Sequence, residues 1–399
     1  MRKFNSPSDV QITVCSIMKN EEKYLRRFLD SLAPAHRIYL EDTGSTDSSY
    51  EIAKEYANGK YKGKLILSQF VWGANFEFDK ARNHVLEKIP SPEDGGGDAV
   101  LHIDLDSFML DGWYEAFQKT IFEHPNFRTL GYGWDDGRSS GNLLLSVDRS
   151  HRNEPGHVKF ISPLHETLEF TEEYERNSES SGYVIVSNTV PYQHGDYDPA
   201  KDRSFYCELG EKAIDIYPNE LERYIFTTMD YEKYGNWEKA LCVYIRCELH
   251  ADAYNVKGIR EILPTRIAKC FSKLGRTEEA EYYYQKGCDI QGAIKENFIE
   301  YAQWLAYRNR PHDALEILER AQSISPAHDW RHNAAYNQPW KEAQIKADAY
   351  CWLGLYKEAV EIFEKALKES QDKRWMDSEG FYADYEFAKN HLENSQKIL

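Results

Sequence analysis

The chain has 399 residues and a mass of 46.6 kDa, which is long for one ordinary hydrophobic core and predicts two or three domains. Its formal charge of −17 argues against a surface that neutralises nucleic-acid phosphates, while a hydrophobic content of 41% is enough to build real cores. Seven scattered cysteines without a Cys-x-x-Cys pair, and no leader-like or membrane-length apolar segment, predict free thiols and a soluble, cytoplasmic protein.

Short apolar runs alternate with segments of helical periodicity from residue 10 onward. The pattern predicts strands at 10–18, 36–41, 64–70 and 99–104, and helices at 20–32, 45–57 and 76–89. Strands and helices in alternation predict a parallel sheet covered by helices. Residues 91–98, Ser-Pro-Glu-Asp-Gly-Gly-Gly-Asp, predict a flexible surface loop. Residues 110–220 contain further possible strands, which we expect to complete the sheet as a mixed one.

Polar clusters follow three of the predicted strands. They are Lys19-Asn20-Glu21, residues 41–45, and Asp104-Leu105-Asp106. Open sheets of this kind bind ligands beyond the carboxyl ends of their strands, so the three clusters predict one site. Side chains two apart on a strand face the same side, and two carboxylates there repel unless a cation lies between them. A solvated strand end is the alternative for an isolated Asp-x-Asp.

The periodicity changes beyond about residue 220. In four segments an alanine stands four residues before a large apolar side chain: Ala240 and Tyr244, Ala280 and Tyr284, Ala314 and Leu318, Ala359 and Phe363. The steps between these alanines, 40, 34 and 45 residues, are the size of a tetratricopeptide unit. Ordinary amphipathic helices do not predict this shared register. We therefore predict an α/β domain over residues 1–215 and an all-α tetratricopeptide-like domain over residues 216–399.

The blocks ITVCSIMKNEEKYLRRFLDSL, YLEDTGSTDSSYEIAKEY, FDKARNHVL and HIDLDS resemble, in order and spacing, the family-two glycosyltransferases of the GT-A fold. DRSHRN, PLHETLEF and YQHGDY resemble later blocks of a subgroup that carries tetratricopeptide repeats behind the catalytic domain. The resemblance implies a Rossmann-like GT-A domain with a mixed sheet, a sugar-nucleotide donor, and Mn²⁺ or Mg²⁺ as cofactor. The usual Asp-Ala-Asp block is followed by an acid, whereas this chain has Leu105 and Ser107.

The resemblance also implies roles for individual residues. Asp104 and Asp106 would hold the metal, and His194 would be a further metal or phosphate ligand. The donor would be bound by Asn20, Glu21, Asp42, Arg82, Asp104 and Arg203. Asp42 would accept from the uracil imide and Arg82 would reach the base or the diphosphate. The structural alternatives are an Asx-turn for Asp42, a solvated helix arginine for Arg82 and a buried core histidine for His194.

An inverting transfer needs a group that takes the proton from the attacking hydroxyl or thiol. The resemblance favours Glu166, in the Leu-His-Glu block, as this base. Asp135 and Asp136 are the alternatives. An exposed surface glutamate without a catalytic role is the structural alternative for Glu166.

The resemblance implies a metal-dependent, inverting transfer of a sugar from a UDP-sugar to an acceptor. The acceptor candidates are a peptide or protein side chain, a glycan, or a hydroxymethylated base of viral DNA, and the acidic charge places DNA last. The repeat domain would shape acceptor access or form a homodimer. The competing hypothesis is a tetratricopeptide peptide-binding scaffold with an inactive transferase domain. A phosphoryl transferase has no support, because the chain lacks a Gly-x-x-x-x-Gly-Lys-Ser/Thr loop.

Overall fold

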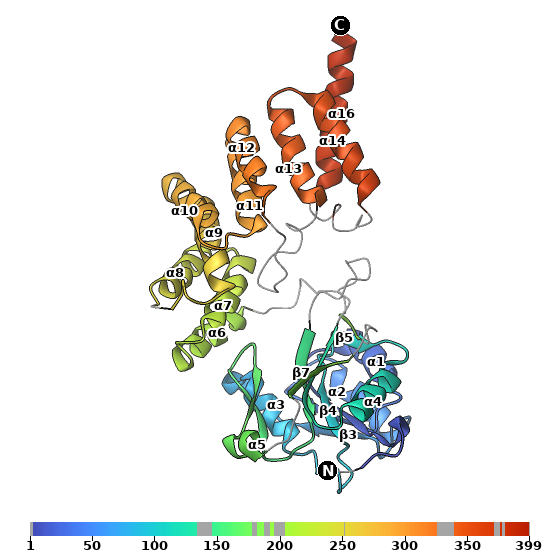
Figure 1. Cartoon of the computed structure of the whole chain (residues 1–399). Helices are drawn as coiled ribbons and strands as arrows, with labels where there is room; N and C mark the ends of the chain where they lie inside the picture. Colours follow the sequence, from blue (N-terminus) through green and yellow to red (C-terminus); the bar gives the residue numbers. More distant parts are fainter. Residues whose placement is uncertain are drawn as a thin grey trace. The chain divides into compact units, whose positions relative to one another are not determined.

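The computed structural model describes residues 3–133, 146–177, 182–186, 192–194, 204–250, 252–324, 339–370, 376 and 380–398. The chain divides into two compact units, one that extends to Phe205 and one that begins at Tyr206 (Figure 1). The boundary predicted between residues 215 and 216 falls inside the first helix of the second unit, α6 (Phe205–Ile216).

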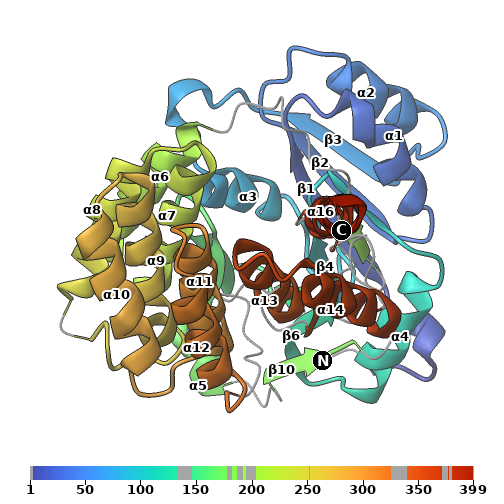
Figure 2. The same ribbon diagram turned by 90° about the horizontal axis from the view of Figure 1, so that it is seen from above.

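A seven-stranded sheet forms the centre of the first unit, in the order β10-β6-β7-β4-β1-β2-β3 (Figure 2). Its strands are β1 (Ile12–Met18), β2 (Arg37–Asp42), β3 (Leu65–Gln69), β4 (Ala99–His102), β6 (Phe127–Gly133), β7 (Ser146–Arg152) and β10 (Gly182–Ile185). β1 to β4 are parallel to one another, whereas β7 is antiparallel to both of its neighbours. The predicted mixed sheet is therefore confirmed.

Helices cover both faces of this sheet. The helices are α1 (Glu22–Ser31), α2 (Ser49–Asn58), α3 (Phe78–Leu86), α4 (Trp113–Glu123) and α5 (Glu172–Asn177), with short 3₁₀ turns at Pro7–Asp9 and Gly73–Asn75. Val14 and Leu40 belong to the larger core of this unit, together with Phe28 of α1. Because side chains alternate along a strand, Cys15 points to the opposite face and packs against Val85 of α3.

Two small antiparallel ribbons complete the first unit among the described residues. β5 (Ser107–Met109) pairs with β11 (Tyr192–His194), and β8 (Val158–Ile161) pairs with β9 (Thr167–Phe170). β5 follows β4 after a turn of four residues. Both ribbons therefore lie close in sequence to the predicted site residues.

The loop between α3 and β4 lies at the surface only in part: Glu93 and Asp94 are exposed, whereas residues 96–98 are buried, so the prediction of a flexible surface loop was wrong for this glycine-rich end. Thr13 Oγ1 donates to the Gly96 carbonyl oxygen at 2.7 Å, and the Gln11 N–H donates to Asp98 Oδ2 at 2.8 Å. A β-carbon on Gly96 would lie 1.8 Å from the Pro90 carbonyl oxygen. The glycine serves close backbone approach here, and the sequence alone does not distinguish this from flexibility.

The second unit consists of helices wherever the structure describes it. After α6, its described helices form four pairs, α7 (Leu221–Lys233) with α8 (Trp237–Glu248), α9 (Ile259–Lys273) with α10 (Thr277–Asp289), α11 (Lys295–Ala306) with α12 (Pro311–Ala321), and α13 (Pro339–Trp352) with α14 (Tyr356–Glu369). A last long helix, α16 (Phe381–Ile398), packs on α14. None of the helices in the described segments combines the length and the apolar character that a membrane span requires.

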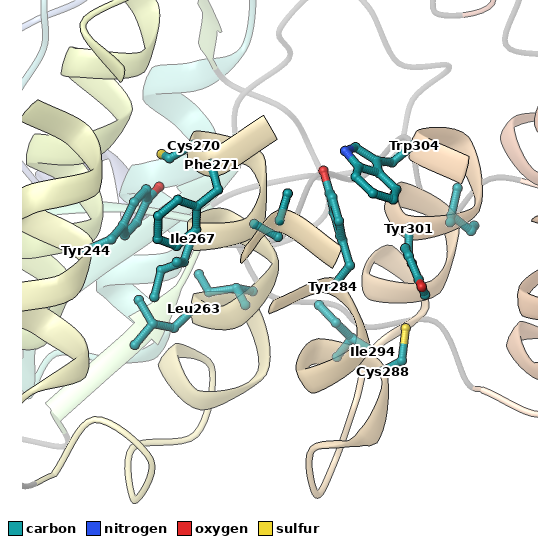
Figure 3. Close-up of a cluster of buried hydrophobic side chains, with 14 of the residues drawn as sticks. Tyr244, Leu263, Ile267, Cys270, Phe271, Tyr284, Cys288, Ile294, Tyr301 and Trp304 are labelled. Carbon is teal, nitrogen blue, oxygen red and sulfur yellow. The ribbon is translucent and has the colours of Figure 1, made fainter. Parts of the chain in front are cut away.

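The predicted repeat register is confirmed. Each of its four alanines lies on the second helix of a pair, and Ala240, Ala280, Ala314 and Ala359 are all 0% exposed. Between pairs, Tyr284 of α10 stacks on Tyr301 of α11 with ring centroids 5.5 Å apart (Figure 3). The small residue lets two helices approach while the aromatic side chain fills the seam, so the core continues from one pair to the next.

Candidate active site

The three predicted polar clusters meet at one edge of the sheet. β1, β2 and β4 are parallel, and β1 lies between the other two. In this register Met18 lies opposite Asp42, and Cys15 lies opposite His102. The segments that follow the three strands therefore share the carboxyl edge, where ligands bind in open α/β sheets.

The loops after β1 and β2 hold each other in place. Asn20 Oδ1 accepts from the Thr46 N–H at 2.7 Å, and the Asn20 N–H donates to Ser45 Oγ at 3.0 Å. The Glu21 N–H donates to Ser49 Oγ at 2.7 Å. Asn20 has a φ of 57°, a left-handed conformation that asparagine tolerates better than most residues. In this structure the two residues predicted to bind the donor also fix the shape of the neighbouring loop.

Asp42 is fully buried at the end of β2. Its Oδ1 accepts from the Ser45 N–H at 3.0 Å, and its Oδ2 accepts from Gln69 Nε2 at 2.7 Å. The bond to Ser45 reaches three residues along the chain, in the loop before α2, so it is not the helix-capping Asx-turn that the sequence left as an alternative, which binds two residues on. The role of Asp42 in uracil recognition stays a prediction.

Asp104 and Asp106 lie in a turn and not on a strand. β4 ends at His102, and the Ser107 N–H donates to the Asp104 carbonyl oxygen at 3.1 Å, which closes a β-turn. Leu105 is buried between the two acids, and Ser107 Oγ donates to Asp106 Oδ1 at 3.2 Å. The expectation that the two acids extend a strand was wrong, because β4 ends at His102 and both acids lie in the tight turn that follows it.

Arg82 of α3 bridges two carboxylates. Its Nη2 donates to Asp104 Oδ1 at 2.6 Å, and its Nε donates to Glu166 Oε1. The side chain of Arg82 is 3% exposed, that of Glu166 4%, and that of Asp104 46%. Burial alone would lower the pKa of the Arg82 guanidinium, but the two carboxylates outweigh it and raise this pKa, so the group stays charged. The alternatives of a solvated helix arginine and an exposed surface glutamate are wrong.

Glu166 lies on the loop between β8 and β9, and α3 holds this hairpin. Asn83 Nδ2 donates to the Phe160 carbonyl oxygen at 2.8 Å, and the Phe160 N–H donates to Asn83 Oδ1 at 2.7 Å. Ser162 and His165 have φ angles of 86° and 51°, which are costly for residues other than glycine and persist only where packing enforces them. Sequence reasoning missed the role of Asn83, although it stands next to Arg82 in the recognised block.

A buried histidine pair lies at the end of β4, two residues before Asp104. His102 Nε2 and His151 Nε2 are 3.2 Å apart, and His151 Nδ1 lies 2.6 Å from the Arg152 carbonyl oxygen. A carbonyl oxygen only accepts, so His151 Nδ1 carries the proton and His151 Nε2 accepts from His102. Burial lowers the pKa of His151 to about 4. No sequence signal links these two histidines, because β4 and β7 become neighbours only in the fold.

The remaining predicted site residues are placed in part. His194 ends β11, and its Cα pairs with that of Ser107 in β5. Its backbone therefore lies beside the turn of residues 104–107, which we call the acidic turn. Asp135, Asp136 and Arg203 lie outside the described residues. Their predicted roles stay predictions.

The acidic turn has the donor chemistry for a hard divalent cation. Asp104 and Asp106 offer carboxylate oxygens, which Mg²⁺ and Mn²⁺ prefer. Among the described residues, no three His, Cys, Asp or Glu side chains are grouped so that they could hold a metal ion by themselves. Mg²⁺ is commonly bound by one or two carboxylates together with phosphate oxygens of a substrate. The residues present fit a cation shared with a diphosphate.

Three of the solved structures that are similar to this chain share little sequence identity with it. The C-terminal part of a TPR repeat-containing protein from Cytophaga hutchinsonii is 14% identical with a TM-score of 0.35, over 48% of this chain and 67% of that one. The TPR protein YrrB, described as having an unusual peptide-binding site, is 16% identical with a TM-score of 0.32, over 48% and 88%. A MamA fragment from Desulfovibrio magneticus is 15% identical with a TM-score of 0.31, over 45% and 95%. Such scores carry no argument about this chain.

Family models match both units. Residues 13–156 match the model of glycosyl transferase family 2. Residues 265–293 match the tetratricopeptide repeat model, and residues 347–370 match the PPR repeat model. No curated protein sequence matches the chain significantly. Together with the mixed sheet and the helix pairs, these matches identify a glycosyl transferase family 2 domain at residues 13–156, followed by tetratricopeptide-type helical repeats.

Proposed function

We propose that the chain is a metal-dependent, inverting glycosyltransferase that moves a sugar from a UDP-sugar to an acceptor hydroxyl or thiol. The family match supports glycosyl transfer in general. The observation that carries the finer proposal is the acidic turn at the carboxyl edge of the parallel strands. The buried Arg82 anchors this turn by its hydrogen bond to Asp104.

Asp104 and Asp106 would hold Mn²⁺ or Mg²⁺ together with the diphosphate oxygens of the donor. When bound, the cation neutralises the negative charge that develops on the departing diphosphate. The chain itself orients the two carboxylates, because Arg82 binds Asp104 and Ser107 binds Asp106. His194 would be a further ligand, since its backbone pairs beside the turn.

The donor nucleotide would lie over the loops after β1 and β2, with Asn20, Glu21, Asp42, Arg82, Asp104 and Arg203 as its binding residues. A carboxylate offers about four acceptor positions, of which Asp42 uses two for Ser45 and Gln69. Asp42 therefore has acceptor positions left for the uracil imide, and because it is fully buried, that contact requires the groups that cover it to move.

The catalytic base would be one of Glu166, Asp135 and Asp136. A base must reach the acceptor, and Glu166 is 4% exposed with its Oε1 bound to Arg82. An ion pair with arginine also favours the charged carboxylate and weakens it as a base. These two observations favour Asp135 or Asp136 over Glu166 in our proposal.

The helical repeats would bind a protein, either the acceptor or a second copy of the chain, since repeats of this type form extended binding surfaces. The acceptor classes are a peptide or protein side chain, a glycan, or a modified DNA base. Screening these acceptors with a turnover-competent donor would choose among them.

The test is replacement of Asp106 by Asn, with UDP release measured for a panel of UDP- and GDP-sugars in the presence of Mn²⁺. We expect the wild-type chain to release UDP from one or more UDP-sugars, and Asp106→Asn to reduce kcat/KM by about 100-fold or more, because the cation loses a charged ligand. Asp111→Asn is the matched control, since Asp111 is an exposed carboxylate just beyond β5. No release by the wild type would favour the scaffold hypothesis, whereas equal release by Asp106→Asn and Asp111→Asn would overturn the role proposed for Asp106.

A further inference from the structure

Arg82 links Glu166, on the β8–β9 loop, to Asp104 in the acidic turn. Nε and Nη2 lie on one edge of the guanidinium, and here this edge is divided between two carboxylates that belong to different elements. The planar group cannot turn toward one carboxylate without changing its bond to the other. The position of Glu166 therefore affects the orientation of the Asp104 carboxylate.

The two carboxylates that bind Arg82 differ in exposure. Glu166 is enclosed at 4% exposure, whereas Asp104 is 46% exposed at the carboxyl edge of the sheet. Among the described residues, Arg82 Nη1 is buried and has no hydrogen-bond acceptor, whereas Nε and Nη2 bind Glu166 and Asp104, so these two carboxylates balance the charge of Arg82. An exposed carboxylate can exchange its partner for a ligand, while an enclosed one keeps it. Glu166 is thus the permanent partner of Arg82.

Hydrogen bonds from α3 hold the β8–β9 hairpin, and with it Glu166, in place. Asn83 fixes the hairpin through both its amide nitrogen and its amide oxygen, and the Phe78 N–H donates to the Pro163 carbonyl oxygen at 3.0 Å. Because α3 carries Arg82 as well as Phe78 and Asn83, the same helix positions both partners of the ion pair. The pair is therefore preorganised before any ligand binds.

We infer that Glu166 is a positioning residue, which acts through Arg82 on Asp104 and so sets the affinity of the acidic turn for a divalent cation. This inference rests on the proposed function of that turn. A guanidinium beside a cation site repels the cation unless its charge is compensated, and Glu166 compensates it. Glu166 also holds the guanidinium in the orientation that binds Asp104 Oδ1, so charge and geometry act in the same direction.

The experiment measures Mn²⁺ binding to the full chain by electron paramagnetic resonance of free Mn²⁺, with and without UDP, so the readout needs no turnover. We expect Glu166→Gln to raise the Kd for Mn²⁺ about tenfold or more, as the loss of an outer-shell partner commonly does. UDP release at saturating Mn²⁺ should keep the shape of its wild-type pH profile. If Glu166 were instead the base, the Kd would stay at the wild-type value, and kcat would fall with loss of one limb of the profile.

Two further variants make the test robust. Glu169→Gln is the matched control, because Glu169 lies three residues further on in β9, is 49% exposed and pairs with the exposed Lys159, so its Kd should equal that of the wild type. Glu166→Asp keeps the charge but draws the carboxylate back from Arg82. It should raise the Kd about threefold, and it serves if Glu166→Gln fails to fold because a buried arginine loses its partner.

The outcomes separate the inference from the proposed function. A wild-type chain that neither binds Mn²⁺ with UDP nor releases UDP would overturn both. A wild-type chain that does both, with Glu166→Asp and any folded Glu166→Gln binding Mn²⁺ as tightly as the wild type, would overturn the inference and leave the proposed function standing. Weaker binding in the Glu166 variants and unchanged binding in Glu169→Gln would support both.

Discussion

A single residue, Gly96, allows two backbone segments to pack closely in the loop before β4. Gly96 lies in the loop before β4, enclosed by the Pro90 carbonyl group and by Asn153 Nδ2. Asn153 Nδ2 also donates to the Pro90 carbonyl oxygen at 2.8 Å and to the Gly97 carbonyl oxygen at 2.9 Å. One side chain thus ties both ends of the loop, and no space remains for a β-carbon at Gly96.

Gly96→Ala is expected to lower the free energy of unfolding by about 3 kcal/mol, because its methyl group would overlap backbone atoms that cannot move independently. Urea unfolding of the purified chain measures the change. Gly63→Ala is the control. Gly63 has a φ of 77° with no atom within 4 Å of an added β-carbon, so only backbone strain of about 1 kcal/mol should appear there. Equal effects at the two glycines would contradict the packing described for the loop.

At the scale of secondary-structure elements, α3 connects the strand ends of the sheet with the β8–β9 loop. Besides Arg82, it carries His84, whose Nδ1 lies 2.8 Å from Glu41 Oε1. Lys88, just beyond the helix, also donates to Glu41, which is fully buried near the end of β2. Carboxylates buried in a sheet need such partners. The same short segment therefore neutralises acids on β2, after β4 and on the β8–β9 loop.

The His102–His151 pair joins β4 and β7 near the site. This pair predicts that the free energy of unfolding depends on pH. The pKa of His151 is about 4 in the folded chain, below the ordinary value of 6.5. The stability that depends on neutral His151 is therefore complete above pH 6.5 and is lost as the pH falls toward 4. Between pH 7.5 and 5, the wild type should lose about 2 kcal/mol more than His151→Gln.

Urea unfolding of both proteins at the two pH values checks this expectation. The comparison cancels the contributions of carboxylates that the two proteins share. Parallel losses in the wild type and in His151→Gln would show that the histidine pair does not tie β7 to β4 as described.

At the scale of the whole molecule, each unit has its own core. The sheet unit is held by clusters drawn from residues 10–186, and the helical unit by clusters drawn from residues 207–388. Among the described residues, no hydrophobic cluster mixes the two units. α13 contributes to both clusters of the helical unit, through Ile345 in one and Trp340 in the other. The row of helices is therefore continuous to its carboxyl end.

Residues 206–399 expressed alone are expected to fold, because their described core requires no side chain from the sheet unit. Circular dichroism should show a helical spectrum and a cooperative thermal transition. As a control, Tyr244→Ala in the isolated unit should lower the free energy of unfolding by about 3 kcal/mol, since Tyr244 is 0% exposed in that core. An aggregated or unfolded fragment would show that the helical unit depends on the first unit.

Much of the fold follows from periodicity. Strands at Ile12–Met18, Arg37–Asp42 and Leu65–Gln69 and the helices between them lie where the alternation of apolar runs predicts them. The alanine register predicts the helix pairs for the same reason, since both are local patterns that repeat along the chain. Residues 110–220 were less predictable, because β6, β7 and β10 are stabilised by pairing across the sheet more than by local sequence.

The sequence by itself determined the acids at strand ends, the repeat register and the order of the elements, because these depend on neighbours along the chain. Only the tertiary structure decided that Asp104 and Asp106 share a turn, that Glu166 is enclosed behind Arg82, and that two distant histidines meet. Such contacts join residues many positions apart, and burial, which sets their charges and their access to ligands, exists only once the chain has folded.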